Sequence, residues 1–127
     1  MSKKIVLVED DAAIIDIYQT MLTKSHFDVE VLSLGADVIK KIKDVAEGTS
    51  PKPDIFLLDL ILPDMNGTEI LAEIRKTPAT KDVKAFILTN QENAEGQMPA
   101  GVKPDKIIIK ANTTPSDLVE IIKEAIG

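Results

Sequence analysis

Polar side chains that could act at one site follow four of the five apolar runs in this sequence. Glu9 and Asp10 come directly after the first run, and Asp59 comes after the third. Thr89 and Lys110 come after the fourth and the fifth. If the runs are parallel strands of one open sheet, these side chains meet where such sheets bind ligands, beyond the carboxyl ends of the strands.

Three carboxylates gathered at one sheet edge need a compensating cation. Two unit charges about 4 Å apart repel each other by about 4 kcal/mol at an effective dielectric constant of about 20. The available ligands are hard oxygens, so they favour Mg²⁺, or Mn²⁺ as a similar divalent ion, over zinc. A metal ion and a lysine beside a carboxylate suit phosphoryl transfer, in which the carboxylate attacks and an aspartyl phosphate forms.

The five apolar runs predict the strands of a buried parallel sheet. Three of the runs are continuously apolar instead of alternating, which is typical of strands that helices cover on both faces. We expect the strands over residues 4–8, 28–32, 54–58, 83–88 and 106–109.

Amphipathic stretches between the runs predict helices. The last helix has the clearest start, since Thr114 can act as its N-cap, Pro115 suits the first turn and Asp117 lies three residues after the cap. Apolar residues recur at helical spacing over residues 12–25, 35–47 and 67–76, and after Thr114.

The segment between the fourth and fifth runs is the weakest helix in the pattern. Residues 93–101 contain two glycines and one proline, so we expect only a short or irregular helix there. The alternation of strands and helices nevertheless predicts an α/β fold, a (βα)5 doubly wound sheet, in a single domain over residues 1–127.

Composition narrows the classes of protein to which the chain can belong. Its net charge of −6 opposes direct binding to nucleic-acid phosphates, and its lack of cysteine excludes disulfides and zinc–thiolate sites. No apolar run approaches the roughly 18 residues of a membrane span, and the first run is too short for a signal peptide. We therefore expect a cytoplasmic protein that binds neither nucleic acid nor membrane.

The ordered motifs resemble the receiver domains of bacterial response regulators in two-component signalling. The most specific stretch is Asp-Leu-x-Leu-Pro-x-Met-x-Gly, which begins at Asp59 and ends at Gly67. An acidic pair lies upstream of it, and Thr89 and Lys110 follow in order, so the resemblance covers essentially the whole chain. It implies the flavodoxin-like fold, with strand order 2-1-3-4-5 and helices on both faces.

The resemblance also implies roles for the acidic residues. Asp59 would accept a phosphoryl group from a phosphohistidine on a partner histidine kinase or histidine phosphotransfer protein. Asp10 would bind Mg²⁺ directly, Glu9 would bind it through water, and Asp59 and the backbone carbonyl of Ile61 would be further ligands.

Two more residues complete the implied site. Thr89 would donate a hydrogen bond to the phosphoryl group once it forms, and Lys110 would pair with it. The resemblance thus implies a phosphoacceptor that switches an interaction surface, and not an enzyme that turns over a separate substrate.

Three positions depart from the pattern of the family, and all lie on its output side. Asn90 follows Thr89, where the family has a small residue, and Ala111 follows the lysine, where the family has proline. The position of the usual switch aromatic is Ile107. We therefore expect intact acceptor chemistry, with a switch that works by ordering of the loops around Thr89 and Lys110.

Several other polar residues have simpler interpretations. Asp11 is expected to begin a helix, Asp64 and Asn66 to lie in a turn before Gly67, and His26 to lie on the surface near a helix end.

Other functions remain to be weighed against the receiver interpretation. An aspartate-nucleophile phosphatase would carry Asp-x-Asp after its first strand, and a flavin or nucleotide module would carry a glycine- or hydroxyl-rich loop there, but this chain has Glu9, Asp10 and Asp11. A receiver-like interaction domain that is no longer phosphorylated stays open. The sequence leaves open the cognate kinase, the signal, the oligomeric state, and whether the chain acts alone or within a longer protein.

Overall fold

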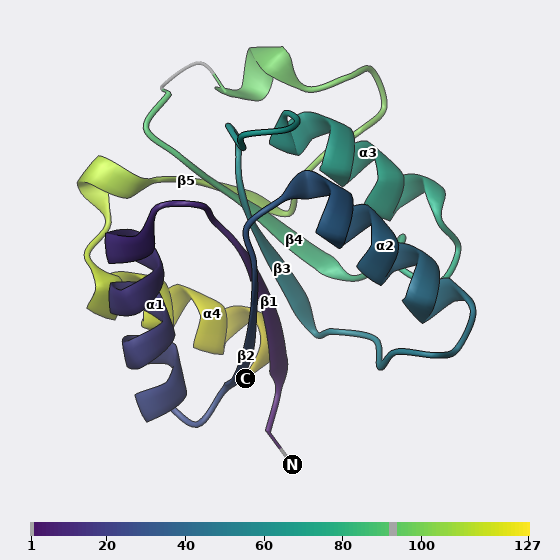
Figure 1. The fold of residues 1–127 in the computed structure, drawn as a ribbon. Helices are drawn as coiled ribbons and strands as arrows, with labels where there is room; N and C mark the ends of the chain where they lie inside the picture. The colour runs from purple at the N-terminus through teal and green to yellow at the C-terminus, as the bar shows by residue number, and fades with distance from the viewer. Residues whose placement is uncertain (1, 92–93) are drawn as a thin grey trace.

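The computed structural model describes residues 2–91 and 94–127, in which strands and helices alternate along the chain (Figure 1). The strands are β1 (Lys4–Val8), β2 (Asp28–Leu32), β3 (Ile55–Asp59), β4 (Lys84–Thr89) and β5 (Lys106–Ile109). The α-helices are α1 (Ala12–Lys24), α2 (Gly35–Ala46), α3 (Gly67–Lys76) and α4 (Pro115–Ile126). Two short 3₁₀ helices, η1 (Ala94–Gln97) and η2 (Lys110–Asn112), flank β5.

All five strands are parallel and lie in the order β2-β1-β3-β4-β5, as predicted. Two predicted strand boundaries were one residue too early, since β3 includes Asp59 and β4 includes Thr89. Both residues are therefore held in the sheet itself by the regular register of the ladder, in which Asp59 lies opposite Leu88. The backbone of the candidate acceptor Asp59 is therefore fixed by its pairing with β4.

The helices cover both faces of the sheet, which explains the continuously apolar strands. The side chains of β1 and β3 alternate between two buried clusters, one on each face. In Figure 1, α2 and α3 lie on one face, and α1 and α4 lie on the other. Among the residues that the structure describes, no helix is long and apolar enough to cross a membrane.

The helix ends follow the predicted chemistry with small shifts. Asp11 is the N-cap of α1, where its side chain accepts hydrogen bonds from the amides of Ala13 and Ile14. Thr114 caps α4 in a full capping box. His26 lies just beyond the end of α1, exposed and in the left-handed region at φ 71°, a conformation that glycine adopts more easily.

The prediction of a short or irregular fourth helix is confirmed, and the described residues contain four α-helices, one fewer than a regular (βα)5 fold. The chain forms only η1 there, and Asn93 of the predicted segment lies outside the described residues. Gly101 adopts φ 78°, which an α-helix does not allow, and Pro99 lacks an amide hydrogen. Pro99 and Gly101 therefore prevent a regular α-helix in the segment where the sequence predicted only a short or irregular one.

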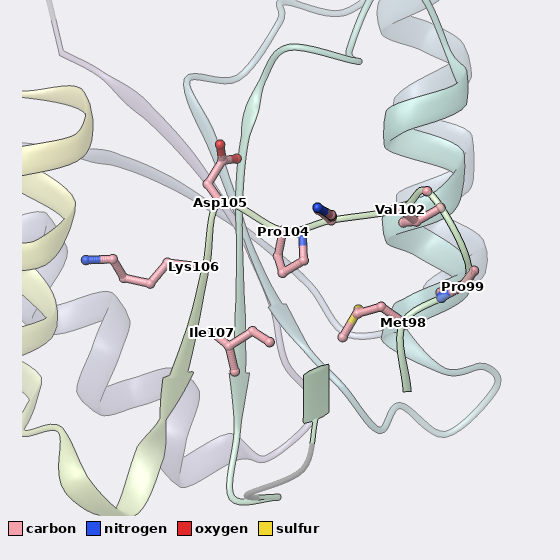
Figure 2. A pocket seen from close by; sticks show the side chains of 9 residues that line it. Met98, Pro99, Val102, Pro104, Asp105, Lys106 and Ile107 are labelled. Atoms are coloured by element: carbon pink, nitrogen blue, oxygen red, sulfur yellow. The ribbon is translucent and has the colours of Figure 1, made fainter. Parts of the chain in front are cut away.

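An irregular segment, residues 98–105, runs beside β5 where a regular fourth helix would pack (Figure 2). A cavity of about 470 Å³ lies against this segment, and Met98, Val102 and Ile107 line it. Figure 2 shows Ile107 turned toward Met98, whereas the amine of Lys106 points away. The irregular segment and its cavity thus lie at the β5 edge of the sheet.

Candidate functional site

Three carboxylates meet beyond the carboxyl ends of β1 and β3. Glu9, Asp10 and Asp59 each offer an oxygen that lies within 4.8 Å of the others. The parallel pairing of the two strands brings them together, because Val8 and Leu58 are register partners and the acidic residues follow them. The sequence prediction of an acidic cluster at this edge is confirmed.

Glu9 is the most buried member of the cluster, with 1% of its surface exposed. Its Oε2 accepts hydrogen bonds from the amides of Asp10 (3.0 Å) and Asp11 (3.2 Å). Its Oε1 accepts a hydrogen bond from Lys110 Nζ at 2.7 Å. A buried carboxylate needs partners of this kind, and Glu9 has them on both oxygens.

Lys110 reaches into the cluster from the end of β5, as the sequence indicated. Its Nζ lies 3.5 Å from Asp59 Oδ1, which is farther than its distance to Glu9. In this structure the ammonium is therefore the direct partner of Glu9 and the second neighbour of Asp59. The sequence suggested charge compensation but could not show which carboxylate receives the shorter contact.

The close packing of charge shifts the pKa values in the cluster. Burial and the neighbouring Glu9 raise the pKa of Asp59 to about 6, although Lys110 opposes the shift. Burial also tends to raise the pKa of Glu9, but Lys110 and the neighbouring Asp59 outweigh this effect and lower that pKa. Burial would lower the pKa of Lys110, yet the two carboxylates raise it. Lys110 therefore stays protonated, whereas the negative charge of ionised Asp59 is disfavoured by its surroundings.

Thr89 is buried at the end of β4, on the strand next to Asp59. Its Oγ1 accepts a hydrogen bond from the amide of Gln91 at 3.0 Å. The hydroxyl hydrogen is not used in that bond, so Thr89 keeps a donor for an incoming oxygen. This arrangement suits the role that the family resemblance implies.

The loop after β3 is held close to the acceptor candidate. Gly67 donates its amide hydrogen to the carbonyl of Leu60 at 2.7 Å. A side chain at Gly67 would overlap the backbone carbonyl of Asp59. Glycine is therefore required here by close approach, and not by a special backbone angle. Ile61 lies on the same loop with 60% of its surface exposed, and its proposed carbonyl ligand stays a prediction.

We expect the substitution Gly67→Ala to lower the free energy of unfolding by about 1 kcal/mol. The clash of the added methyl group destabilises the fold by more than the higher helix propensity of alanine stabilises it. Denaturant unfolding of the variant measures this effect. Gly96→Ala is the matched control, because a methyl group there meets no atom within 4 Å. Equal stability of Gly67→Ala and the wild type would contradict the close contact with Asp59.

Two residues that were interpreted as turn residues have more specific roles. Asn66 is the N-cap of α3 and forms a capping box with Glu69, which the Asn-x-x-Glu spacing could have revealed. Asp64 accepts hydrogen bonds from the amides of Gly35 (2.7 Å) and Ala36 (2.9 Å) at the start of α2. These bonds hold the pKa of Asp64 below its usual value. The cap of α2 thus comes from another loop, since Leu34 cannot supply one.

Comparison with known proteins agrees with the fold and with the acidic cluster. Residues 5–123 match the response regulator receiver domain. The chain belongs to this family. The acidic cluster of Glu9, Asp10 and Asp59 fits the phosphorylation site of such receiver domains. The resemblance on which the sequence interpretation rested is confirmed.

Individual receiver proteins show how far the likeness extends. The response regulator Rcp1 of Synechocystis is 36% identical over 96 residues, which are 73% of this chain and 65% of Rcp1. PhoP of Bacillus subtilis, a transcriptional regulator of alkaline phosphatase synthesis, is 34% identical over 60% of this chain and 29% of its own length. The chain therefore spans less than two thirds of these relatives.

Solved receiver structures superimpose over nearly the whole chain. The phosphorylated cyanobacterial phytochrome response regulator RcpA has a TM-score of 0.80 at 30% identity, covering 98% of this chain and 91% of RcpA. The Mn²⁺-bound form of Rcp1 has a TM-score of 0.78 at 28% identity, covering 96% of this chain and 90% of Rcp1. The missing fourth α-helix therefore leaves the family fold recognisable.

Proposed function

We propose that this receiver domain accepts a phosphoryl group on Asp59, in a reaction that depends on Mg²⁺ or Mn²⁺. The donor would be a phosphohistidine on a partner histidine kinase or histidine phosphotransfer protein. The observation that carries the proposal is the cluster of three carboxylates with Lys110 at one end of a receiver fold. The phosphorylated RcpA and Mn²⁺-bound Rcp1 structures support it by similarity.

The donor set suits a hard divalent cation. Glu9, Asp10 and Asp59 offer only oxygen, and one ammonium cannot balance three carboxylates. Asp10 is exposed, whereas Glu9 is buried and Asp59 is half-buried, so Asp10 is the member best placed to bind an ion arriving from solvent. We assign the direct contacts to Asp10 and Asp59, a water-mediated contact to Glu9, and a further contact to the carbonyl of Ile61. A bound ion would neutralise negative charge on the phosphoryl oxygens.

The side chains of this chain supply the remaining steps. A carboxylate oxygen of Asp59 attacks phosphorus, the new O–P bond forms, and the N–P bond to the donor histidine breaks with its electron pair passing to the imidazole. Lys110, which already lies 3.5 Å from Asp59, neutralises a phosphoryl oxygen. Thr89, whose hydroxyl accepts the Gln91 amide, donates its hydroxyl hydrogen to another oxygen. Formation of the phosphoryl group thus draws two strand ends toward Asp59.

The wider assignment follows from this chemistry. We propose that residues 1–127 form a single receiver domain that serves as a signalling phosphoacceptor, with self-dephosphorylation as its only turnover, and that it acts in the cytoplasm. Its phosphorylation would alter a surface that binds a downstream protein. A receiver-like interaction domain without phosphorylation is the alternative, and the experiment below distinguishes the two.

We expect intact mass spectrometry to detect one phosphoryl adduct after incubation with acetyl phosphate and Mg²⁺, because a small phosphodonor needs only the acceptor and the metal, and Lys110 speeds the transfer. The adduct should be lost in Asp59→Asn and when EDTA replaces the metal. Asp16→Asn is the matched control, because it is the same aspartate-to-asparagine substitution at an exposed position on α1.

An adduct that persists in Asp59→Asn would show that another residue is the acceptor. Absence of any adduct in the folded wild-type protein, with acetyl phosphate and with beryllofluoride alike, would favour the interaction domain that is not phosphorylated.

A further inference from the structure

Two of the departures from the family pattern contact each other. The Asn90 side chain accepts a hydrogen bond from the amide of Ala111, with a distance of 2.8 Å between Oδ1 and N. Asn90 directly follows Thr89 at the end of β4, and Ala111 directly follows Lys110 at the end of β5. The bond therefore joins the two loops that carry the groups proposed to hold the phosphoryl oxygens.

The chemistry of the two positions is reciprocal. A small residue at position 90 would have no side-chain acceptor, and a proline at position 111 would have no amide hydrogen. The bond can form only when both positions depart from the family pattern together. One contact thus accounts for two residues that, in the sequence, are separate exceptions.

The turn that begins at Lys110 needs an external partner for its amides. The first amides of a helical turn have no acceptor within it, and Ile109, the N-cap of η2, provides no side-chain cap. Asn90 supplies that cap from the neighbouring strand end. A second bond, from Thr113 Oγ1 to the carbonyl of Ile109 at 3.0 Å, closes the other side of the turn.

The position of this turn sets where the Lys110 ammonium can reach. Lys110 lies at the end of the edge strand β5, which pairs with β4 alone. The paired ladder ends at Thr89 and Ile109, so beyond it the link between the two strand ends is made by the Asn90 side chain. From there the Lys110 side chain, 13% exposed, extends to Glu9 and Asp59.

We propose that Asn90 is a positioning residue, which fixes the Lys110 turn through the Ala111 amide and couples it to the loop of Thr89. This inference rests on the role proposed for Lys110 in phosphorylation. It gives the chain a mechanical link between β4 and β5 beyond the last paired residues of the two strands, Thr89 and Ile109. Movement of Thr89 toward a phosphoryl group would then be transmitted to the Lys110 turn by a hydrogen bond.

The test uses Asn90→Ala in the full chain, with Asn112→Ala as the matched control. Asn112 lies on the same exposed turn, and its side chain has no hydrogen bond with the described residues. By NMR, we expect Asn90→Ala to speed exchange of the Ala111 amide by about threefold or more and to shift the Lys110 Cε resonance. We expect Asn112→Ala to change neither.

Labelling kinetics separate positioning from a general loss of structure. We expect Asn90→Ala to slow Mg²⁺-dependent labelling by acetyl phosphate about threefold in the wild-type background and to have no effect in a Lys110→Met background. Equal slowing in both backgrounds, or an unchanged Lys110 resonance, would overturn the inference. If the wild type forms no adduct, the proposed function fails, and the two NMR measurements still decide the role of Asn90.

Discussion

Without metal, the variant Asp59→Asn should be more stable than the wild type by about 1–2 kcal/mol near pH 8. Asp59 carries a charge that burial and Glu9 disfavour, and asparagine removes this charge while keeping the shape of the side chain. The raised pKa would correspond to roughly 3 kcal/mol if taken at face value, and solvent screening of this partly accessible group reduces it. Denaturant unfolding in EDTA measures the difference.

The pH dependence of this gain has a definite sign. The folded pKa of Asp59, about 6, lies above the ordinary value of 3.8, so the folded protein binds the proton more tightly than the unfolded chain. The wild type therefore gains stability relative to Asp59→Asn as the pH falls through about 6, and the two should be equal below about pH 4. Above about pH 7 the advantage of the variant should be constant.

Mg²⁺ should make the wild type more stable than Asp59→Asn. A cation that binds only the folded wild type stabilises it by mass action, by about 2.7 kcal/mol at a hundredfold excess over its dissociation constant. Asp59→Asn lacks one proposed metal ligand, so Mg²⁺ should stabilise it less than it stabilises the wild type. Asp16→Asn, with its carboxylate on the α1 surface, should respond to both pH and Mg²⁺ as the wild type does. A metal-free Asp59→Asn protein less stable than the wild type would contradict the charge repulsion.

The substitution Arg75→Ala should lower the free energy of unfolding by about 2–3 kcal/mol, because it removes four charge-assisted hydrogen bonds, one of them to the partly buried carbonyl of Val83. Arg75 donates to the carbonyls of Val83 (2.7 Å), Lys81 (3.0 Å) and Lys103 (3.0 Å). It also pairs with Asp105 at 2.8 Å. These contacts tie the end of α3 to the start of β4 and to the irregular segment beside β5.

Lys76→Ala is the matched control for this prediction. Lys76 is the next residue, and its exposed ion pair with Glu73 is the type that contributes little. In Arg75→Ala, hydrogen exchange should show the loss of amide protection mainly in residues 98–105, while the amides of β1 and β3 remain protected. Uniform loss of protection across the sheet would mean that Arg75 supports the core and not specifically this segment.

The residue pattern was sufficient to predict the sheet and the acidic cluster, whereas the strand order came from the resemblance to receiver domains. Continuous apolar runs leave few alternatives to a buried parallel strand, and the polar residue that ends each run must then lie at one edge. Asp59 and Thr89 were predicted correctly in position because the sheet register carries them. The capping box at Thr114 is local, so the sequence displays it directly.

Contacts between loops could not be predicted in the same way. Asp64 caps α2 across 29 residues, and Asn90 reaches Ala111 across 21, so neither spacing is visible in a local pattern. The preference of Lys110 for Glu9 over Asp59 depends on differences in distance of less than one ångström. Weakness of the fourth helix was visible in its glycines and proline, but the anchoring of the replacing segment by Arg75 was not.

The manner in which Arg75 holds that segment affects how the protein can evolve. Apart from Asp105, it binds backbone carbonyls, which every amino acid provides. The exposed side chains of residues 98–104 can therefore change while the path of the chain stays anchored at Lys103 and Asp105, although Gly101 is constrained by its backbone angle and Met98 and Val102 by their packing. A lineage could remodel the chemistry of the cavity wall beside β5 by single substitutions, without first having to preserve the packing of an amphipathic helix.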